Sequence, residues 1–339
     1  MYDVGIVGCG VIGTRLAESF AEHPDTTVAA ACDVDAERAE SFAAERDAAA
    51  YTDHGTMLAE ADLDVLYVGV PPVHHREIAG DGLAAGVNVI CEKPIAEGAD
   101  AGAELAAMEA DSDLVTAVNL PFRYTPGFVE LRERVADGEI GEPRRVSLDF
   151  RFPQWPREWQ DVDWLRSREQ GGPIREVGTH FLFGVRELFG GITRVSAEVQ
   201  YSGPDAYEES VVGWFEAGSE AGEPSGTVDG AAAGDAPVHG TLDLLTDHGQ
   251  PEENAITVTG TEGELALTEW YRLLAAPGTD EERELCADRA STTLALVDEF
   301  VTELEGGDGD LVSFAEATAV QRVVDAVFDS AGEVVDCSA

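Results

Sequence analysis

The first third of the chain alternates between short apolar runs and amphipathic stretches. The apolar runs are typical of buried strands, which we predict over residues 4–7, 28–32, 65–70, 88–91 and 114–118. The amphipathic stretches between them predict helices over residues 14–22, 35–46, 75–85 and 98–110. Strands that alternate with helices in this way indicate a parallel, doubly wound sheet with right-handed crossovers.

The pattern changes after about residue 120. Most of the later apolar segments follow one another without helices between them, which predicts a largely antiparallel sheet. Its strands are expected over residues 144–152, 195–201, 210–215, 240–246, 255–259 and 264–267. Helices are expected over residues 126–137, 178–188, 291–304 and 313–331. Residues 217–237 are rich in Gly, Ala, Ser and Asp, and we expect a mobile hairpin loop there.

A length of 339 residues exceeds the usual size of one hydrophobic core, so two domains are expected. The change of pattern places the boundary near residue 120. We therefore predict an α/β domain over residues 1–120 and an α+β domain over residues 121–339. The last helix is expected to pack back onto the first domain.

The net charge is unusual for a globular protein. The chain has 67 acidic and 21 basic residues, a formal charge of −46, and the carboxylates are spread along its whole length. We interpret this as the surface of a salt-adapted protein, because in molar salt the Debye length falls to about 3 Å and repulsion is screened. The alternative is an ordinary acidic protein, for which −46 is large. Nucleic acids and anionic membranes are excluded as partners by the same charge.

The five cysteines predict neither a disulfide framework nor a metal site. Their number is odd and no two form a C-x-x-C pair, and Cys9, Cys32 and Cys91 lie in apolar runs where buried thiols are common. The chain opens directly on a predicted strand, and no apolar run is long enough to span a membrane. We expect a soluble, cytoplasmic protein.

Residues 8–13, Gly8-Cys9-Gly10-Val11-Ile12-Gly13, fit the pattern G-x-G-x-x-G. The motif follows a predicted strand and opens a predicted helix, which is the context that dinucleotide binding requires. Gly8 would permit the turn, Gly10 the approach of a pyrophosphate, and Gly13 close packing of helix on strand. The helix N-terminus would offer amide donors and positive dipole to the phosphates. A glycine turn without a ligand is the less favoured alternative.

Asp33 lies twenty residues after Gly13, at the end of the second predicted strand. A carboxylate there can hold the ribose hydroxyls of NAD and would repel the 2′-phosphate of NADP. Arg38 and Arg15 are near in sequence and could soften this preference, so NADP stays a less favoured alternative. Asp33 could also cap the following helix, and both roles can hold together.

Glu92-Lys93-Pro94 comes directly after the fourth predicted strand, at the edge of the sheet where ligands bind. A lysine that faces this crevice can hydrogen-bond a substrate oxygen and stabilise developing negative charge. A lysine after a strand is usually a solvated surface residue, but lysines are few in this chain.

Residues 171–180, from Gly171 to His180, hold a second candidate pair. Glu176 and His180 are four residues apart, so on a helix they share a face. A carboxylate beside an imidazole orients the ring and favours its protonated form, which suits proton exchange with an alcohol. Taken alone, such a pair is more often surface decoration.

With these motifs in view, the chain resembles the glucose–fructose oxidoreductase / inositol dehydrogenase family over nearly its full length. Besides residues 8–13 and 92–94, the resemblance is carried by residues 70–75, 123–124, 138–143, Trp164 and residues 171–180. It implies that Lys93 and His180 are catalytic and that Glu92 and Lys93 border the nicotinamide. It also implies an open C-terminal sheet that carries the substrate site and often an oligomer interface.

Two positions depart from the family pattern. The family usually has Asp four residues before the histidine, where this chain has Glu176, whose longer arm can do the same electrostatic work. The family often has Asn at the position of Pro72, which has no polar side chain to offer a ribose or substrate.

We therefore expect hydride transfer between a nicotinamide and a hydroxyl-bearing carbon of a sugar, polyol or cyclitol, by a homodimer or homotetramer. His180 would exchange the hydroxyl proton, Lys93 would polarise the oxygen and Glu176 would support His180. The alternatives are a non-catalytic, dinucleotide-sensing regulator on the same fold and an enzyme that reduces an imine or enone. The residues expected to bind the cofactor are Gly8, Gly10, Val11, Ile12, Gly13, Asp33, Pro71, His75, Glu92 and Lys93.

Overall fold

The fold is described from a computed structural model over residues 1–160, 162–218 and 237–337. It divides into two compact units, and each is described by itself. Unit 1 comprises Met1–Pro121 and Ser291–Thr318, and unit 2 comprises Phe122–Ala290 and Ala319–Ala339.

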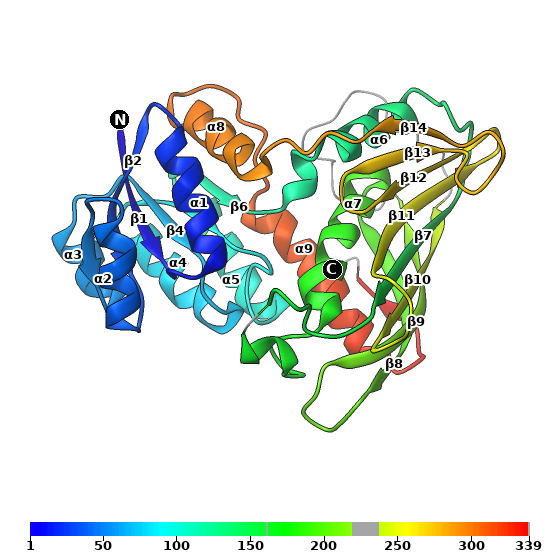
Figure 1. Ribbon diagram of the computed structural model, residues 1–339, viewed down its shortest axis with the longest axis horizontal. Helices are drawn as coiled ribbons and strands as arrows, with labels where there is room; N and C mark the ends of the chain where they lie inside the picture. Colours follow the sequence, from blue (N-terminus) through cyan, green and yellow to red (C-terminus); the bar gives the residue numbers. More distant parts are fainter. Residues whose placement is uncertain (161, 219–236, 338–339) are drawn as a thin grey trace. The chain divides into compact units, whose positions relative to one another are not determined.

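Unit 1 is built on a six-stranded, fully parallel sheet with the strand order β3-β2-β1-β4-β5-β6 (Figure 1). This is the order of the doubly wound dinucleotide-binding fold. Its strands are β1 (Tyr2–Val7), β2 (Thr26–Cys32), β3 (Ala49–Tyr51), β4 (Val65–Val68), β5 (Asn88–Cys91) and β6 (Thr116–Val118). Its helices are α1 (Val11–Glu22), α2 (Ala36–Ala44), α3 (His54–Glu60), α4 (His75–Ala84), α5 (Ala99–Ala110) and α8 (Thr292–Leu304). Every residue of β4 is buried, as expected for a central strand covered on both faces.

Unit 2 has a nine-stranded sheet with the order β14-β13-β12-β11-β7-β10-β9-β8-β15 among the described residues. Neighbouring strands are antiparallel except β7 and β10, which are parallel. The strands are β7 (Pro143–Phe152), β8 (Ile192–Tyr201), β9 (Glu208–Ala217), β10 (Val238–Thr246), β11 (Glu253–Gly260), β12 (Glu264–Thr268), β13 (Arg272–Ala275), β14 (Arg283–Cys286) and β15 (Val335–Asp336). The longer helices are α6 (Pro126–Ala136) and α7 (Thr179–Phe189), while α9 (Phe314–Asp329) runs from unit 1 into unit 2.

The sheet of unit 2 places one face in a hydrophobic core. Along β7, Val146, Leu148, Phe150 and Phe152 are buried, and the residues between them lie on the opposite face. Helix α6 packs on β12 and β13, and α7 packs on α6 and β9. The alternation along β7 therefore reflects a sheet with helices on one side.

The predicted fold class, a parallel α/β domain followed by an α+β domain with a mostly antiparallel sheet, is confirmed. The sequence patterns missed β3, α3, β13, β14 and β15. β3 is a short strand with two exposed residues, and α3 buries Met57 alone, so neither has the apolar pattern that signals an element. The predicted hairpin at residues 217–237 falls almost wholly outside the described residues, but its flanking residues, Ala217 and Val238, are paired.

The first division, between Pro121 and Phe122, lies beside the predicted boundary at residue 120, but residues 291–318, which were expected in the second domain, belong to unit 1. Helix α8 packs on α1, where Ser19 and Thr293 join the two helices by a 2.8 Å hydrogen bond, and the first residues of α9, the last helix, also belong to unit 1. The Val118 amide donates to the carbonyl of Val312, which extends the edge of the sheet. The apolar pattern of this segment predicts its helix but cannot tell which core it joins.

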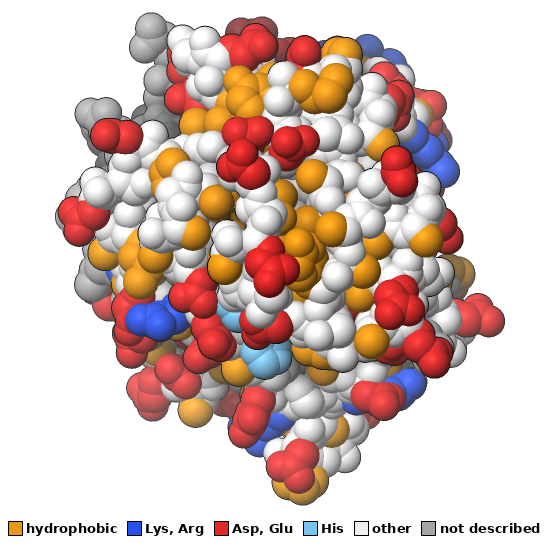
Figure 2. All heavy atoms as spheres, turned by 90° about the vertical axis from the view of Figure 1, so that its left-hand side faces the viewer, with side chains coloured by type: hydrophobic (Ala, Val, Ile, Leu, Met, Phe, Trp, Pro, Cys, Tyr) orange, Lys and Arg blue, Asp and Glu red, His pale blue; other side chains and the backbone are white. Residues whose placement is uncertain are grey.

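Carboxylates are distributed over the surface and do not form one cluster. Figure 2 shows a face on which Asp and Glu side chains are scattered and Lys and Arg side chains are few. In the described part of the chain, no helix is both long and apolar enough to cross a bilayer.

Candidate active site

Most of the predicted cofactor-binding residues lie at the carboxyl ends of four adjacent strands of unit 1. The glycine loop follows β1, Asp33 follows β2, Pro71 follows β4, and Lys93 follows β5. Because parallel strands end at one edge of the sheet, these residues share the crevice where open α/β sheets bind ligands. The cofactor-binding role of each remains a prediction from this placement.

The glycine loop has the shape that a pyrophosphate requires. Gly8 has φ +99°, and a Cβ there or at Gly13 would collide with a backbone carbonyl, of Gly69 and of Gly8 respectively. By contrast, a Cβ at Gly10 would meet no atom within 4 Å. Gly10 caps α1 without any side-chain hydrogen bond, so the amides of Val11, Ile12 and Gly13 open the helix as donors. The loop is tight where helix and strand pack and open where a phosphate would approach.

Asp33 is held beside this loop by its own backbone neighbours. Its Oδ2 accepts from the amide of Cys9 at 3.0 Å, and its Oδ1 accepts from the amide of Asp35 at 3.0 Å. Arg38 Nη1 lies 3.4 Å from both carboxylate oxygens, and the Arg38 side chain is half exposed. The site therefore combines the carboxylate expected for NAD with a neighbouring guanidinium. The helix is capped by Asp35, whose side chain accepts from Arg38, and not by Asp33.

A buried polar cluster, Tyr67, Glu92 and Asn119, lies next to Lys93 in the chain. Glu92 Oε1 accepts from the Tyr67 hydroxyl at 2.8 Å and from the Asn119 amide at 2.6 Å. Burial raises the pKa of Glu92, and it also raises the pKa of Tyr67 well above its usual value. Side chains of unit 1 thus hold the Glu92 carboxyl, and no sequence pattern predicted Tyr67 or Asn119 as its partners.

Lys93 is the single lysine of the chain, although arginines are common in it. It is half-buried at the end of β5, and the peptide bond to Pro94 is cis. A lysine differs from arginine in being a compact point charge that can give up its proton. Lys93 therefore offers this edge of the sheet a compact ammonium group, which a guanidinium would not match in shape.

His75, another residue predicted to bind the cofactor, is the first residue of α4. Its side chain is fully buried, and its ring nitrogens lie 2.9 Å from the carbonyl of Pro94 and 2.7 Å from the carbonyl of Val70. Burial lowers the pKa of this histidine to about 4. His75 therefore ties the loop after β4 to the loop after β5, and its contact with the cofactor stays a prediction.

In unit 2, His180 is the second residue of α7 and lies in an aromatic environment. Its ring is 5.4 Å from that of Trp270 in an edge-to-face arrangement, and 6.3 Å from that of Phe122. Trp270 and the preceding Glu269 both have positive φ, +74° and +53°. Two adjacent residues in this region form a tight turn between β12 and β13, which places the half-buried indole against the histidine.

Glu176 does not lie on the same regular helix as His180. It belongs to a π-helical turn, Ile174–Gly178, which precedes α7. Its Oε1 accepts from the Gln160 amide at 3.1 Å and lies 3.8 Å from the Arg157 guanidinium. Glu176 and His180 are therefore not one α-helical turn apart on the same face, as their spacing suggested, because Glu176 lies in the π-helical turn. The action of Glu176 on His180 stays a prediction.

Arg157 and its aromatic neighbours were missed at the level of sequence. The guanidinium lies between 5.0 and 5.9 Å from the ring centroids of Trp159, Trp155, Phe152 and Trp270. It therefore connects Glu176 with the indole that contacts His180. The motif Trp155-Pro156-Arg157-Glu158-Trp159 is a signal that could have drawn attention to it, because arginine favours aromatic faces.

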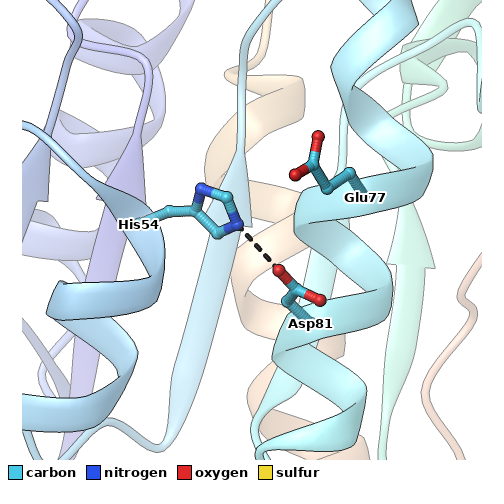
Figure 3. Close-up of side chains that lie close together, drawn as sticks. All are labelled: His54, Glu77 and Asp81. Atoms are coloured by element: carbon cyan, nitrogen blue, oxygen red, sulfur yellow. Dashed lines mark hydrogen bonds and ion pairs between the residues drawn. The ribbon is translucent and has the colours of Figure 1, made fainter.

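Three metal-capable side chains lie together elsewhere in unit 1, on α3 and α4 (Figure 3). His54, Glu77 and Asp81 offer ligand atoms within 4.8 Å of one another. His54 Nε2 already lies 2.9 Å from Asp81 Oδ2, and both carboxylates are exposed. A surface His–Asp pair accounts for this geometry, and the cluster supplies no group to the sheet edge described above.

Similarity to known proteins agrees with this architecture. A dTDP-3,4-didehydro-2,6-dideoxy-alpha-D-glucose 3-reductase from Streptomyces violaceoruber is 27% identical over 97% of this chain and 95% of its own length. A protein of the same name from Saccharopolyspora spinosa is 30% identical over 60% of this chain, which spans only 61% of that relative. Levoglucosan dehydrogenase, solved with NADH and L-sorbose, is 19% identical with a TM-score of 0.82, over 99% of this chain and 98% of that chain.

The parallel sheet with its glycine loop and the second α+β unit define a nicotinamide-dependent oxidoreductase of two domains. Residues 2–120 match the oxidoreductase family with the NAD-binding Rossmann fold, and residues 128–266 match the GFO/IDH/MocA C-terminal domain. The chain belongs to the GFO/IDH/MocA oxidoreductase family, so the resemblance seen in its sequence is confirmed. The predictions of an NAD(P)-dependent dehydrogenase and of NAD as its cofactor are confirmed with it.

Proposed function

We propose that the protein transfers a hydride between NAD and a hydroxyl-bearing carbon of a sugar, polyol or cyclitol. The observation that carries the proposal is that the glycine loop, Asp33 and Lys93 lie at the carboxyl ends of β1, β2 and β5, which belong to one parallel sheet. The choice of substrate class is supported by the relatives, which include sugar reductases and an inositol 2-dehydrogenase from Rhizobium meliloti. The aromatic surroundings of His180 also suit a ligand with an apolar ring face.

Each candidate catalytic residue has one role in this proposal. His180 takes the hydroxyl proton as the alcohol is oxidised and returns it in the reverse direction. Lys93 donates a hydrogen bond to the same oxygen and stabilises its developing negative charge. Glu176 supports His180 from the π-helical turn. When bound, NAD supplies the acceptor for the hydride, and the glycine loop and Asp33 hold its phosphates and ribose.

The direct test is a screen of aldoses, polyols and inositols in molar KCl, with NADH formation followed by absorbance. Turnover of at least one member of these classes is expected, and it should be lost in Lys93→Ala and His180→Ala. Binding of NAD without turnover of any of these compounds would contradict the proposal. That outcome would favour a dinucleotide-sensing regulator, or an enzyme for an imine or enone if such a substrate turns over.

We expect kcat/KM to be higher with NAD than with NADP, because the Asp33 carboxylate repels a 2′-phosphate. Asp33→Ala should lower the ratio of kcat/KM with NAD to kcat/KM with NADP. Arg38→Ala should raise this ratio, since the substitution removes the guanidinium that lies 3.4 Å from the Asp33 carboxylate. Steady-state kinetics with one substrate and both cofactors measures all three ratios. A wild-type preference of about tenfold or more for NADP would show that Arg38 dominates the ribose site.

We also propose that the protein is adapted to high salt. With a formal charge of −46, the carboxylates repel one another in dilute buffer, and molar salt screens this repulsion by shortening the Debye length to about 3 Å. The thermal midpoint is therefore expected to rise as KCl increases from low to molar concentration. Differential scanning fluorimetry in KCl, with sucrose at matched osmolality as the control, measures it. A midpoint that stays flat or falls with KCl would contradict the proposal.

The face of the unit 2 sheet that lies opposite α6 and α7 supports assembly into a homodimer or homotetramer. On β7 this face carries the half-buried side chains of Ser147, Asp149 and Arg151. Burial raises the pKa of Asp149 on this face, although the Arg151 guanidinium opposes the rise. The described cysteines are free thiols, as is usual in a reducing compartment, and we propose that the enzyme acts in the cytoplasm.

A further inference from the structure

Glu208, the first residue of β9, is a buried carboxyl group that the proposed mechanism does not use. Its side chain is fully buried, and its Oε1 accepts a 2.6 Å hydrogen bond from the backbone amide of Ile174. Its Oε2 is buried and has no hydrogen-bond partner among the described residues. Burial raises the pKa of Glu208 to about 7, although the amide of Ile174 and the charge of Arg175 oppose the rise. A buried carboxyl with an unbonded oxygen is unfavourable and calls for a function.

The hydrogen bond from Ile174 connects Glu208 to both candidate catalytic residues of unit 2. The carbonyl of Ile174 accepts from the amide of Thr179, the residue directly before His180. Two residues earlier, the carbonyl of Gly172 accepts from the amide of Glu176 at 3.0 Å. The turn that carries Glu176, and the start of the helix that carries His180, are thus both fixed from the segment that Glu208 grips.

The packing around Gly172 also brings the Glu208 carboxyl close to the backbone of this segment. Gly172 has φ +93°, and a Cβ on it would collide with the carboxyl oxygens of Glu208. A Cβ on Gly171 would collide with the backbone of Leu165 on the other side. The absence of side chains at the two glycines therefore lets the chain lie directly against the Glu208 carboxyl.

We propose that Glu208 is a positioning residue that sets the placement of His180 through the π-helical turn Ile174–Gly178. It touches neither substrate nor cofactor in this assignment. The inference rests on the proposed function for its catalytic consequence, but its structural part, that Glu208 holds the turn, can be tested without any substrate.

The experiment compares Glu208→Ala and Glu208→Gln with the wild type, and Glu209→Gln is the matched control. Glu209 is the next residue of β9, and its side chain is exposed. Hydrogen–deuterium exchange measured by mass spectrometry follows the amides of residues 172–182. Steady-state kinetics on a substrate from the screen gives kcat and the KM for NAD. If Glu208→Ala does not fold, Glu208→Asp replaces it, because its shorter arm withdraws the oxygen from Ile174.

Glu208→Ala should speed exchange over residues 172–182 by about tenfold or more, since it removes the acceptor that closes the turn. It should lower kcat by roughly 10- to 100-fold and leave the KM for NAD unchanged, because the NAD-binding residues lie in unit 1. Glu208→Gln keeps an oxygen that accepts from Ile174 and should restore most of both properties. Glu209→Gln should match the wild type.

Unchanged exchange in Glu208→Ala would overturn the inference, whether or not any substrate is found. Faster exchange with an unchanged kcat would also overturn it, because the turn would then not position His180. If the screen finds no substrate, the proposed function fails, and exchange alone decides whether Glu208 holds the turn. Equal losses of exchange protection and of kcat in Glu208→Gln and Glu208→Ala would show that the hydrogen bond from Ile174 does not hold the turn, and would overturn the inference.

Discussion

Replacing His180 with alanine is expected to lower kcat by roughly 10²- to 10⁴-fold, the usual size for the loss of a general base. The imidazole lies against Trp270 and Phe122 at the start of α7. The substitution removes this imidazole, which is the proposed proton acceptor. The affinity for NAD should stay the same, since the glycine loop and Asp33 belong to unit 1. Stopped-flow measurement of NADH formation and NAD titration by protein fluorescence separate the two effects.

The control for this experiment is His239→Ala, which removes a histidine that is well exposed on β10. That variant should retain the wild-type kcat and the wild-type affinity for NAD. A kcat of His180→Ala within about threefold of the wild-type value would be far less than a general base contributes, and it would remove His180 from the mechanism.

Replacing Lys93 with alanine is expected to lower kcat by roughly 10²- to 10³-fold, because the ammonium would stabilise charge that grows on the substrate oxygen in the transition state. Lys93→Arg should recover little of this activity, since the planar guanidinium does not replace a compact point charge. Single-turnover rates at saturating NAD measure both variants. A Lys93→Arg enzyme as fast as the wild type would mean that only a positive charge is needed at this position.

The presence of a single lysine allows an independent check of the same site. Reductive methylation can modify only the amine of Lys93 and the N-terminal amine, and mass spectrometry distinguishes the two products. Protection of Lys93 by NAD, with no protection of the N-terminus, is expected if the lysine borders the nicotinamide. Equal modification with and without NAD would place Lys93 away from the cofactor.

Elements with local signals could be predicted from the sequence alone. The buried strands β1, β2, β4 and β5 are continuous apolar runs, and the spacing of the glycines in residues 8–13 identifies the glycine loop. The carboxyl-end positions of Asp33 and Lys93 follow from these strands without any knowledge of packing. The family resemblance followed from the same motifs, and residues 2–120 and 128–266 match that family.

Contacts between distant segments became visible only in the folded chain. Residues 291–318 join unit 1 because α8 packs on α1, and His75 became a link between two loops because both of its nitrogens reach backbone carbonyls. Glu208 grips a turn that lies 34 residues earlier in the chain, and Trp270 reaches His180 from a hairpin. Periodicity records which face of an element is buried, but the partner of a buried polar group depends on how separate elements pack, and no local pattern encodes that.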